Sequence, residues 1–498
     1  MEQTIQEFKA YLAEMRMYGE AMGIMSFDAN TIAPKANVGR RAVRNGFFAK
    51  KMYDLATSDK MKSFLDELEK HKDKLDLETA AMYRVAKKRY DKSTKIPAQL
   101  VKEMSELGAK SNAAWEKARA NDDFELFAPY LEELVAKAKE MAKYRQKPGQ
   151  NLYDVLLDDY EEGMTMELYD EFFKKLRASI VPLLKKVMES DKKIDAGFMS
   201  SYVPKAEQEK ISVFAAQTMG FDLDRGYIAE STHPFCNGTH KTDVRITTRY
   251  DENDFASSFY SILHESGHAI YEQSVADELA DTVITGGAST GLHESQSRFY
   301  ENVIGRSRPF WQYMTNELKP YLPKEFANVT AEEFYKANNQ VQPSLIRVEA
   351  DELTYSLHIM VRYEIERMLL NDEIEVRDLP RVWNEKFEEY LGITPPNNTL
   401  GVLQDIHWSW AYFGYFPTYA LGSAYAAQFL TAMKKDLDFD TLVAKGDFAT
   451  ITKWLTDKIH RYGQTFTPAE LLMQVCGEQL NADHYIKYLT DKFEEIYG

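Results

Sequence analysis

The chain has 498 residues, of which 44% are hydrophobic, and a formal net charge of −17. This hydrophobic fraction is ample for a large folded core, which excludes an intrinsically disordered chain. The excess of acidic residues argues against a surface that binds nucleic acid or anionic membranes, because such a surface needs clustered lysine and arginine. No apolar stretch approaches a membrane span, no signal peptide is recognisable, and two cysteines are too few for a disulfide framework, so we expect a cytoplasmic protein.

Most of the chain has helical periodicity. The segments at 61–90 and 124–146 space apolar residues three or four apart and are rich in Ala, Leu, Glu and Lys. No repeat of fixed period and no Pro/Ser-rich linker occurs, which argues against a solenoid or a string of small domains. We therefore expect a mainly α protein with a single domain over residues 1–498.

The clearest strand pattern lies at 243–250. Here Val244, Ile246, Thr248 and Tyr250 alternate with polar residues. An ordinary strand at the edge of a core has the same pattern. This strand, however, stands directly before the motif described next, and an exposed strand edge can hold an extended peptide by backbone pairing. We expect a small antiparallel sheet at this place.

The strongest chemical signal is the HEXXH motif at residues 264–268. Apolar residues at 255–270 recur at helical spacing around it, and Asp251 or Asn253 is the candidate N-cap. On one helix the two histidines reach a single metal ion, and Glu265 lies beside the open coordination position as the candidate general base. Such a motif also arises by chance, on the order of a few times per hundred chains of this kind. The alternative is therefore an amphipathic helix with two hydrogen-bonded histidines.

A third ligand is required, because catalytic zinc binds three protein side chains and one water. A Gly-rich turn, followed by Ser289 or Thr290 as a cap, predicts a second helix that begins near His293. Glu294 on this helix is the natural third ligand. His293 is rotated by about 100° from it, and we expect His293 behind the ligands or along a cleft. The Gly-rich turn lacks the Gly-Lys-Ser/Thr ending of a phosphate loop, which argues against nucleotide binding.

Two other segments carry candidate residues. His233, Cys236 and His240 resemble a second metal cluster, but no fourth ligand is nearby, and we interpret the segment as a loop that shapes a cleft, with His233 facing the substrate. An aromatic-rich segment follows residue 404. His407 in it, with Tyr419 or Tyr415, is a candidate hydrogen-bond donor to an oxyanion. For each tyrosine the alternative is packing in an aromatic core.

Six short motifs in one order indicate a family. They are His233-Pro234-Phe235, Asp243-Val244-Arg245-Ile246-Thr247, His264-Glu265-Ser266-Gly267-His268, His293-Glu294-Ser295-Gln296, Ile346-Arg347-Val348-Glu349-Ala350-Asp351 and Gly401-Val402-Leu403-Gln404-Asp405-Ile406-His407-Trp408. With these motifs the chain resembles the thermostable metallocarboxypeptidases of the carboxypeptidase Taq type. It departs from the family pattern at Phe27, where the family usually carries Trp, which concerns the packing of that helix and not the chemistry.

The resemblance implies one divalent metal per chain, bound by His264, His268 and Glu294, with Glu265 as general base. Zinc suits these ligands best, and cobalt or manganese also fits them. The resemblance further implies a large, single-body, zincin-like helical fold with a deep groove. In this fold residues 1–200 form a helical part that covers the groove, and the active-site motifs lie at 230–425.

The implied reaction removes single residues from peptides with a free C-terminus, by a homodimeric enzyme. Recognition of the terminal carboxylate needs an arginine fork. Arg347 is the first candidate, against the alternative of a surface pair with Asp351. Arg245 is the second candidate, and its alternative role is to stabilise the strand through an ion pair with Asp243.

Two other functions remain open at this point. A zinc oligopeptidase that cuts peptides internally would use the same metal centre. A catalytically silent, metal-binding helical scaffold would bind metal without turnover, although structural sites usually fill all four positions with protein ligands.

Overall fold

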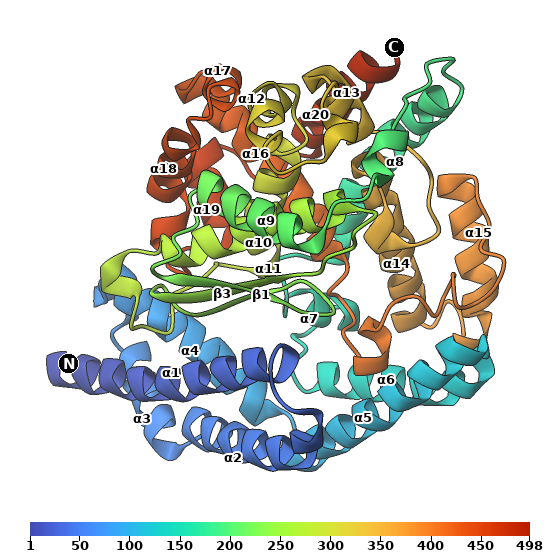
Figure 1. Ribbon diagram of the computed structural model, residues 1–498. Coiled ribbons are helices and arrows are strands. Elements are labelled where there is room, and N and C mark those ends of the chain that lie inside the picture. The colour runs from blue at the N-terminus through green and yellow to red at the C-terminus, as the bar shows by residue number, and fades with distance from the viewer. The chain divides into compact units, whose positions relative to one another are not determined.

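The chain folds mainly into helices, which confirms the predicted fold class (Figure 1). The structure is a computed structural model that describes residues 1–498. The chain divides into two compact units, and each unit is assembled from three separate stretches of sequence. Unit 1 contains Met1–Thr94, Asp195–Asn338 and Phe429–Gln479, and unit 2 contains Lys95–Ile194, Asn339–Gln428 and Leu480–Gly498. The single domain expected over residues 1–498 stays a prediction.

Unit 1 contains the strands and most of the helices. Its elements are α1 (Glu2–Asn30), α2 (Val38–Ala56), α3 (Asp59–Glu69), α4 (Leu77–Lys95), α9 (Lys205–Met219), β1 (Gly226–Glu230), β2 (Cys236–His240), β3 (Asp243–Thr248), α10 (Phe255–Gln273), α11 (Thr290–Arg298), α12 (Arg308–Leu318), α13 (Ala331–Ala337), α17 (Phe439–Ala444), α18 (Phe448–Lys458) and α19 (Pro468–Cys476).

Unit 2 is helical throughout. Its elements are α5 (Ala98–Asn121), α6 (Phe124–Lys143), α7 (Leu152–Leu157), α8 (Met166–Met188), α14 (Glu352–Leu370), α15 (Leu379–Leu391) and α20 (Ala482–Tyr497), while α16 (Pro417–Asp436) begins in unit 2 and ends in unit 1. None of the helices of the chain combines the length and the apolar character that a membrane crossing requires.

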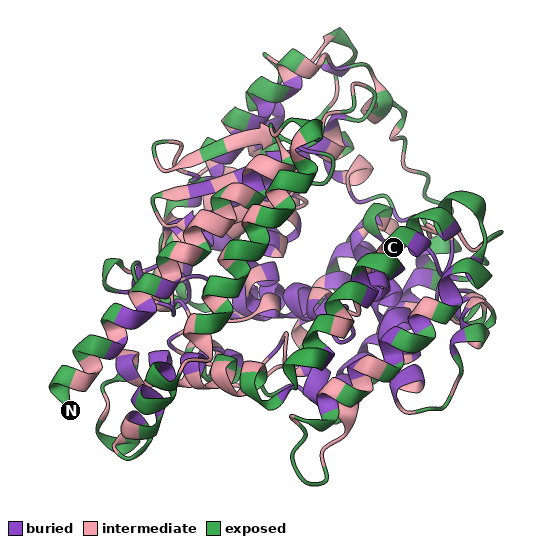
Figure 2. Ribbon diagram, turned by 90° about the horizontal axis from the view of Figure 1, so that it is seen from below, coloured by how far each residue is buried: buried purple, intermediate pink, exposed green.

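The segment at 61–90, which reads as continuous helix, forms two helices. Before α3, the Ser58 hydroxyl accepts the backbone N–H of Met61 at 3.0 Å. Before α4, the Asp76 carboxylate accepts the N–H of Thr79 at 2.8 Å. Because capping side chains satisfy the free N–H groups of a first turn, each cap defines a new helix start. Buried residues follow single faces of such helices, as Figure 2 shows.

The small sheet has the strand order β1-β3-β2. β2 pairs antiparallel with β3, but β1 pairs parallel with β3, so the sheet is mixed and the expected antiparallel sheet is wrong in this respect. The predicted strand at 243–250 is the central strand, and it ends at Thr248. Val244 and Ile246 are fully buried in it. The edge strands lack this clear alternation, which is why the sequence indicated only the central one.

The sheet packs against α10, and its edge strand β2 also packs against α1 (Figure 1). The Arg16 guanidinium donates to the carbonyl of Thr239 at 3.0 Å, and the amide of Asn237 donates to the carbonyl of Gly23 at 3.3 Å. Helix α1 therefore occupies part of the edge of β2. At the end of α1, Phe27 is buried and packs edge-on against Phe235, so phenylalanine is part of the core at this position.

Candidate active site

Helix α10 carries the HEXXH motif. The side chain that caps this helix is Asp254, which accepts the N–H of Ser257 at 3.2 Å. The expected caps, Asp251 and Asn253, are wrong, because Asp251 instead accepts the N–H of Asn253 within the preceding turn. Several capping residues follow one another here, and only the backbone conformation selects among them.

Helix α11 carries the third candidate ligand. Ser289 caps it by accepting the N–H of Leu292 at 3.0 Å, as one of the two expected residues. Glu294 lies in the helix beyond this cap and is buried. Because α11 packs directly against α10, the Glu294 carboxylate faces the histidines of the motif.

The side chains of His264, His268 and Glu294 converge. Nε2 of His264 lies 3.6 Å and Nε2 of His268 3.5 Å from Oε2 of Glu294. The three donor atoms all lie within 4.8 Å of one another. Tetrahedral ligands at about 2.0–2.1 Å from zinc are spaced by about 3.3 Å, close to the two His–Glu distances, so the set suits a single ion. This is the only such group in the chain, and the segment of His233 and Cys236 forms none.

Both histidines present Nε2 because Nδ1 is engaged elsewhere. Nδ1 of His264 donates to Oε2 of Glu301 at 2.9 Å. Nδ1 of His268 lies 2.6 Å from Nδ1 of His293, whose Nε2 donates to Oε1 of Glu272 at 2.7 Å. Partners of this kind fix the tautomer and orientation of metal-binding histidines. His293 thus lies behind a candidate ligand, as its position on the helix predicts.

Two arginines keep the buried carboxylates ionised. Arg298 contacts Oε1 of Glu294 at 2.7 Å and Oε2 of Glu301 at 3.2 Å, and Arg306 contacts Oε1 of Glu301 at 3.3 Å. Burial by itself would raise the pKa of both carboxyl groups. Arg298 and the neighbouring histidines outweigh burial and hold each pKa well below its usual range. A buried carboxylate that stays ionised is ready to bind a cation.

Burial shifts the pKa values of two further residues of the motif, His268 and Glu265. Burial, with the nearby His293 and His264, lowers the pKa of His268 to about 3, so its ring is neutral near pH 7. Burial also raises the pKa of Glu265 to about 7, although the charge of His264 opposes this shift. A carboxylate with a pKa near the working pH is suited to accept a proton and to return it.

A comparison with known proteins agrees with this geometry. The sequence profile of the carboxypeptidase Taq (M32) metallopeptidases matches residues 7–493. The chain belongs to this family. The resemblance expected from the six motifs is confirmed, and the chain is a metallocarboxypeptidase, a hydrolase of peptide bonds.

M32 relatives match the chain over its whole length. Carboxypeptidase 1 of Bacillus subtilis is 42% identical over 99% of this chain and 98% of its own. Thermostable carboxypeptidase 1 of Pyrococcus furiosus is 36% identical over 99% of this chain and 98% of its own. The crystal structure of the M32 carboxypeptidase from Deinococcus radiodurans R1 superposes with a TM-score of 0.95 at 35% identity and covers 100% of both chains.

Gly267 lets the two helices of the candidate metal site approach closely. A Cβ at this position would lie 2.5 Å from the carbonyl oxygen of Gln296 and 2.7 Å from Cα of Ser297. Both atoms belong to the backbone of α11, so no side chain can rotate to make room. The small residue within the motif therefore determines how near Glu294 comes to the histidines.

We expect Gly267→Ala to destabilise the protein by about 1–3 kcal/mol, the usual cost of overpacking. The variant should also bind zinc more weakly, because α11 must move away from α10. Urea unfolding and zinc titration measure the two effects. The matched control is Gly46→Ala in α2, where nothing lies within 4 Å of the added Cβ. Equal stability and zinc affinity of the Gly267 variant and the wild type would contradict the close approach.

In unit 2, Arg347 is buried and paired. Its Nε and Nη2 both lie 2.9 Å from Oδ1 of Asp405, and Nη2 of Arg362 lies 2.6 Å from Oδ2 of the same carboxylate. The alternative pair with Asp351 does not form, because Asp351 accepts the N–H of Thr354 at the start of α14. A role of Arg347 in binding the substrate carboxylate stays a prediction.

His407 and Tyr419 lie together in unit 2. Nε2 of His407 is 3.3 Å from the Tyr419 hydroxyl, and the rings of Tyr415 and Tyr419 are 5.3 Å apart. Burial lowers the pKa of His407 to about 4, although Asp405 opposes this shift. The ring is therefore neutral near pH 7 and able to donate one hydrogen bond. Its action on an oxyanion stays a prediction.

The two remaining candidates, Arg245 and His233, differ in their surroundings. Arg245 forms a two-bonded ion pair with Asp243, both contacts at 2.7 Å, and its guanidinium lies 5.3 Å from the ring centre of Phe27. The structural alternative for Arg245 is therefore observed. His233 is exposed, and its carbonyl accepts the Ser231 hydroxyl at 2.6 Å. Substrate contacts of either residue stay predictions.

Several supporting residues escaped the sequence analysis. The sequence could have indicated Glu301 and Arg298, because they follow Glu294 by seven and four residues, a spacing that places side chains on one face of a helix. Nothing in the sequence indicated Glu272, because only the fold brings it to His293. In unit 2, the buried Glu366 accepts the indole N–H of Trp408 and the backbone N–H of Gly414, each at 2.8 Å, and so anchors the segment that carries His407.

Proposed function

We propose that the protein removes single residues from the free C-termini of peptides with one zinc ion bound by His264, His268 and Glu294. The convergence of these three donors within 4.8 Å, beside Glu265, carries the proposal. Two imidazoles and one carboxylate are a ligand set that leaves a fourth position open for water. Cobalt or manganese would suit the same set.

The residues of unit 1 supply the proton transfer. When bound, the metal polarises the scissile carbonyl and lowers the pKa of a water molecule. Glu265 takes a proton from the attacking water and delivers it to the leaving amine. Glu301 and His293 hold the two imidazole rings in place through their Nδ1 atoms, which keeps the donor geometry fixed during the reaction.

Further residues are proposed to bind the substrate. Arg347 binds the terminal carboxylate of the peptide through the N–H groups at the Nη1 end of its guanidinium, while Asp405 holds Nε and Nη2. His407 and Tyr419 donate hydrogen bonds to the oxyanion. Arg245 and His233 are secondary substrate contacts.

The specificity test uses one peptide in two forms, with a free and with an amidated C-terminus. We expect mass spectrometry to detect a ladder shortened from the C-terminus for the free acid and no product for the amide, because an amide offers no carboxylate to Arg347. A chelator should stop the reaction, and added zinc should restore it.

Each alternative gives a different result in this experiment. Internal fragments from the amidated peptide would indicate an oligopeptidase. An intact peptide in every arm, with metal bound, would indicate a silent scaffold.

Two further expectations rest on the family resemblance. We propose that the protein is a homodimer and that it acts in the cytoplasm. Light scattering of the purified protein tests the first expectation, and a monomeric mass at micromolar concentration would contradict it.

A further inference from the structure

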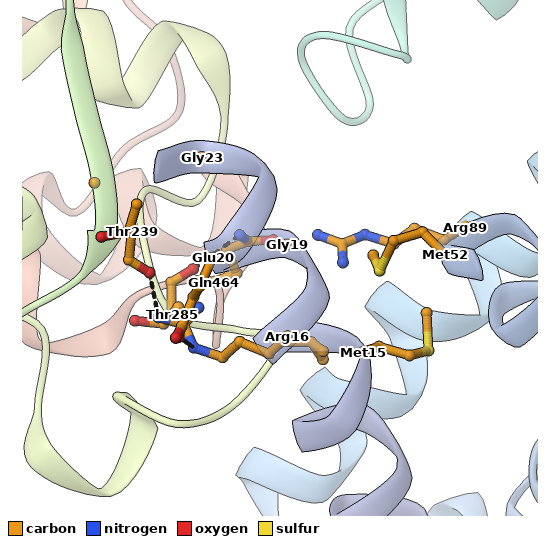
Figure 3. Close-up of a pocket in the computed structure, with 12 residues that line it drawn as sticks. Met15, Arg16, Gly19, Glu20, Gly23, Met52, Arg89, Thr239, Thr285 and Gln464 are labelled. Carbon is orange, nitrogen blue, oxygen red and sulfur yellow. Dashed lines mark hydrogen bonds and ion pairs between the residues drawn. The ribbon is translucent and has the colours of Figure 1, made fainter. Parts of the chain in front are cut away.

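Unit 1 contains a second concave site, a cavity of about 210 Å³ lined by residues of α1, α2, α4 and β2 together with Val283, Thr285 and Gln464 (Figure 3). None of the three candidate metal ligands lines it, so the proposed peptidase mechanism does not account for it.

Helix α1 carries a glycine where it faces the cavity. An added Cβ at Gly19 would meet no atom within 4 Å, whereas at Gly23 it would lie 2.9 Å from Cγ2 of Thr239. Gly23 therefore serves close packing of α1 on β2, but Gly19 does not. A glycine inside a helix costs about 1 kcal/mol relative to alanine, and at Gly19 no close contact explains this cost.

Among the charged side chains that line the cavity, only Arg89 has no partner. Nε of Arg16 contacts Glu20 at 2.9 Å, and its Nη2 donates to the carbonyl of Thr239 at 3.0 Å. Arg89 of α4 makes no hydrogen bond or ion pair, and its guanidinium extends toward Gly19 (Figure 3). The chain has 78 acidic against 61 basic residues, so carboxylate partners are abundant in general, yet none pairs with Arg89.

We propose that this cavity binds a small oxyanion, a phosphate or a carboxylate, through the Arg89 guanidinium against the open face of α1 at Gly19. A guanidinium presents paired N–H donors that match the oxygens of either group. A cavity of about 210 Å³ has room for a phosphate or a small organic acid. Arg89 is exposed at the cavity mouth, so a free anion reaches it from solvent.

Calorimetric titration of the zinc-loaded protein with sodium phosphate and with sodium succinate, at constant ionic strength, tests the proposal. We expect Arg89→Met to weaken binding by about 10- to 100-fold, the equivalent of hydrogen bonds to a charged group. Gly19→Leu should abolish binding, because the new side chain fills the cavity, and leucine favours the helix over glycine. The matched control is Lys51→Met, which removes one exposed positive charge next to Met52 of the cavity wall.

The variants separate this site from anion binding at the metal, which Arg89→Met leaves unchanged. Peptide turnover of all three variants should stay within about twofold of the wild type, since their side chains contact no reacting group. Tighter binding of phosphate than of succinate would indicate a phosphate ligand, and the reverse would indicate a carboxylate ligand. Either outcome supports the proposal if Arg89→Met weakens the binding. Absence of binding, or equal binding by the wild type and Arg89→Met, would overturn it. If Gly19→Leu does not fold, Arg89→Met alone decides.

Discussion

Glu265→Gln is expected to lower kcat/KM for release of a C-terminal residue by about 10³- to 10⁴-fold, near the upper range for loss of a general base. The glutamine keeps the size of the side chain but accepts no proton from the attacking water. The donors His264, His268 and Glu294 are unchanged, so the variant should bind one zinc per chain as the wild type does. Steady-state kinetics and metal analysis measure the two quantities on the same preparation.

The matched control for this variant is Glu278→Gln. Glu278 is an exposed carboxylate a short distance along the same chain segment, and its neutralisation should leave turnover within about twofold of the wild type. A Glu265 variant with near-normal turnover would remove Glu265 from the role of base. Loss of zinc from that variant would instead assign Glu265 to metal binding.

Glu294→Gln is expected to weaken zinc binding by more than the 10- to 100-fold that loss of an outer partner typically costs. An amide oxygen is a weaker donor than the ionised carboxylate that Arg298 maintains at this position. Ligand binding stabilises a fold by about 2.7 kcal/mol at 100 times the Kd. Zinc should therefore raise the Tm of the wild type and leave that of the variant nearly unchanged, as differential scanning calorimetry would show.

Glu301→Gln provides a graded comparison. It removes the charge of the carboxylate that holds Nδ1 of His264 and leaves all three candidate ligands intact. Its zinc affinity should fall by about 10- to 100-fold, between that of the wild type and that of Glu294→Gln. Stoichiometric, tight zinc binding by Glu294→Gln would mean that the third ligand lies elsewhere.

Local rules explain how much of this centre the sequence predicted. Residues four apart on a helix share one face, so the spacing of His264 and His268 already places both rings on one side of α10. A cap and a Gly-rich turn predicted the helix that carries Glu294, and the order of six motifs identified the M32 family. The same rules misplaced the start of α10 by one to three residues, because Asp251, Asn253 and Asp254 all have capping side chains.

The sequence by itself determined the helical fold class, the central strand, the HEXXH helix and the identity of the three candidate ligands. These features depend on spacing within one element or on short motifs. Only the tertiary structure decided which groups position the ligands and the arginines. Glu272 binds His293, and Asp405 rather than Asp351 pairs with Arg347. It also decided that β1 runs parallel to β3. Such contacts join segments far apart in the chain, and periodicity within a segment carries no information about which distant surface it will meet.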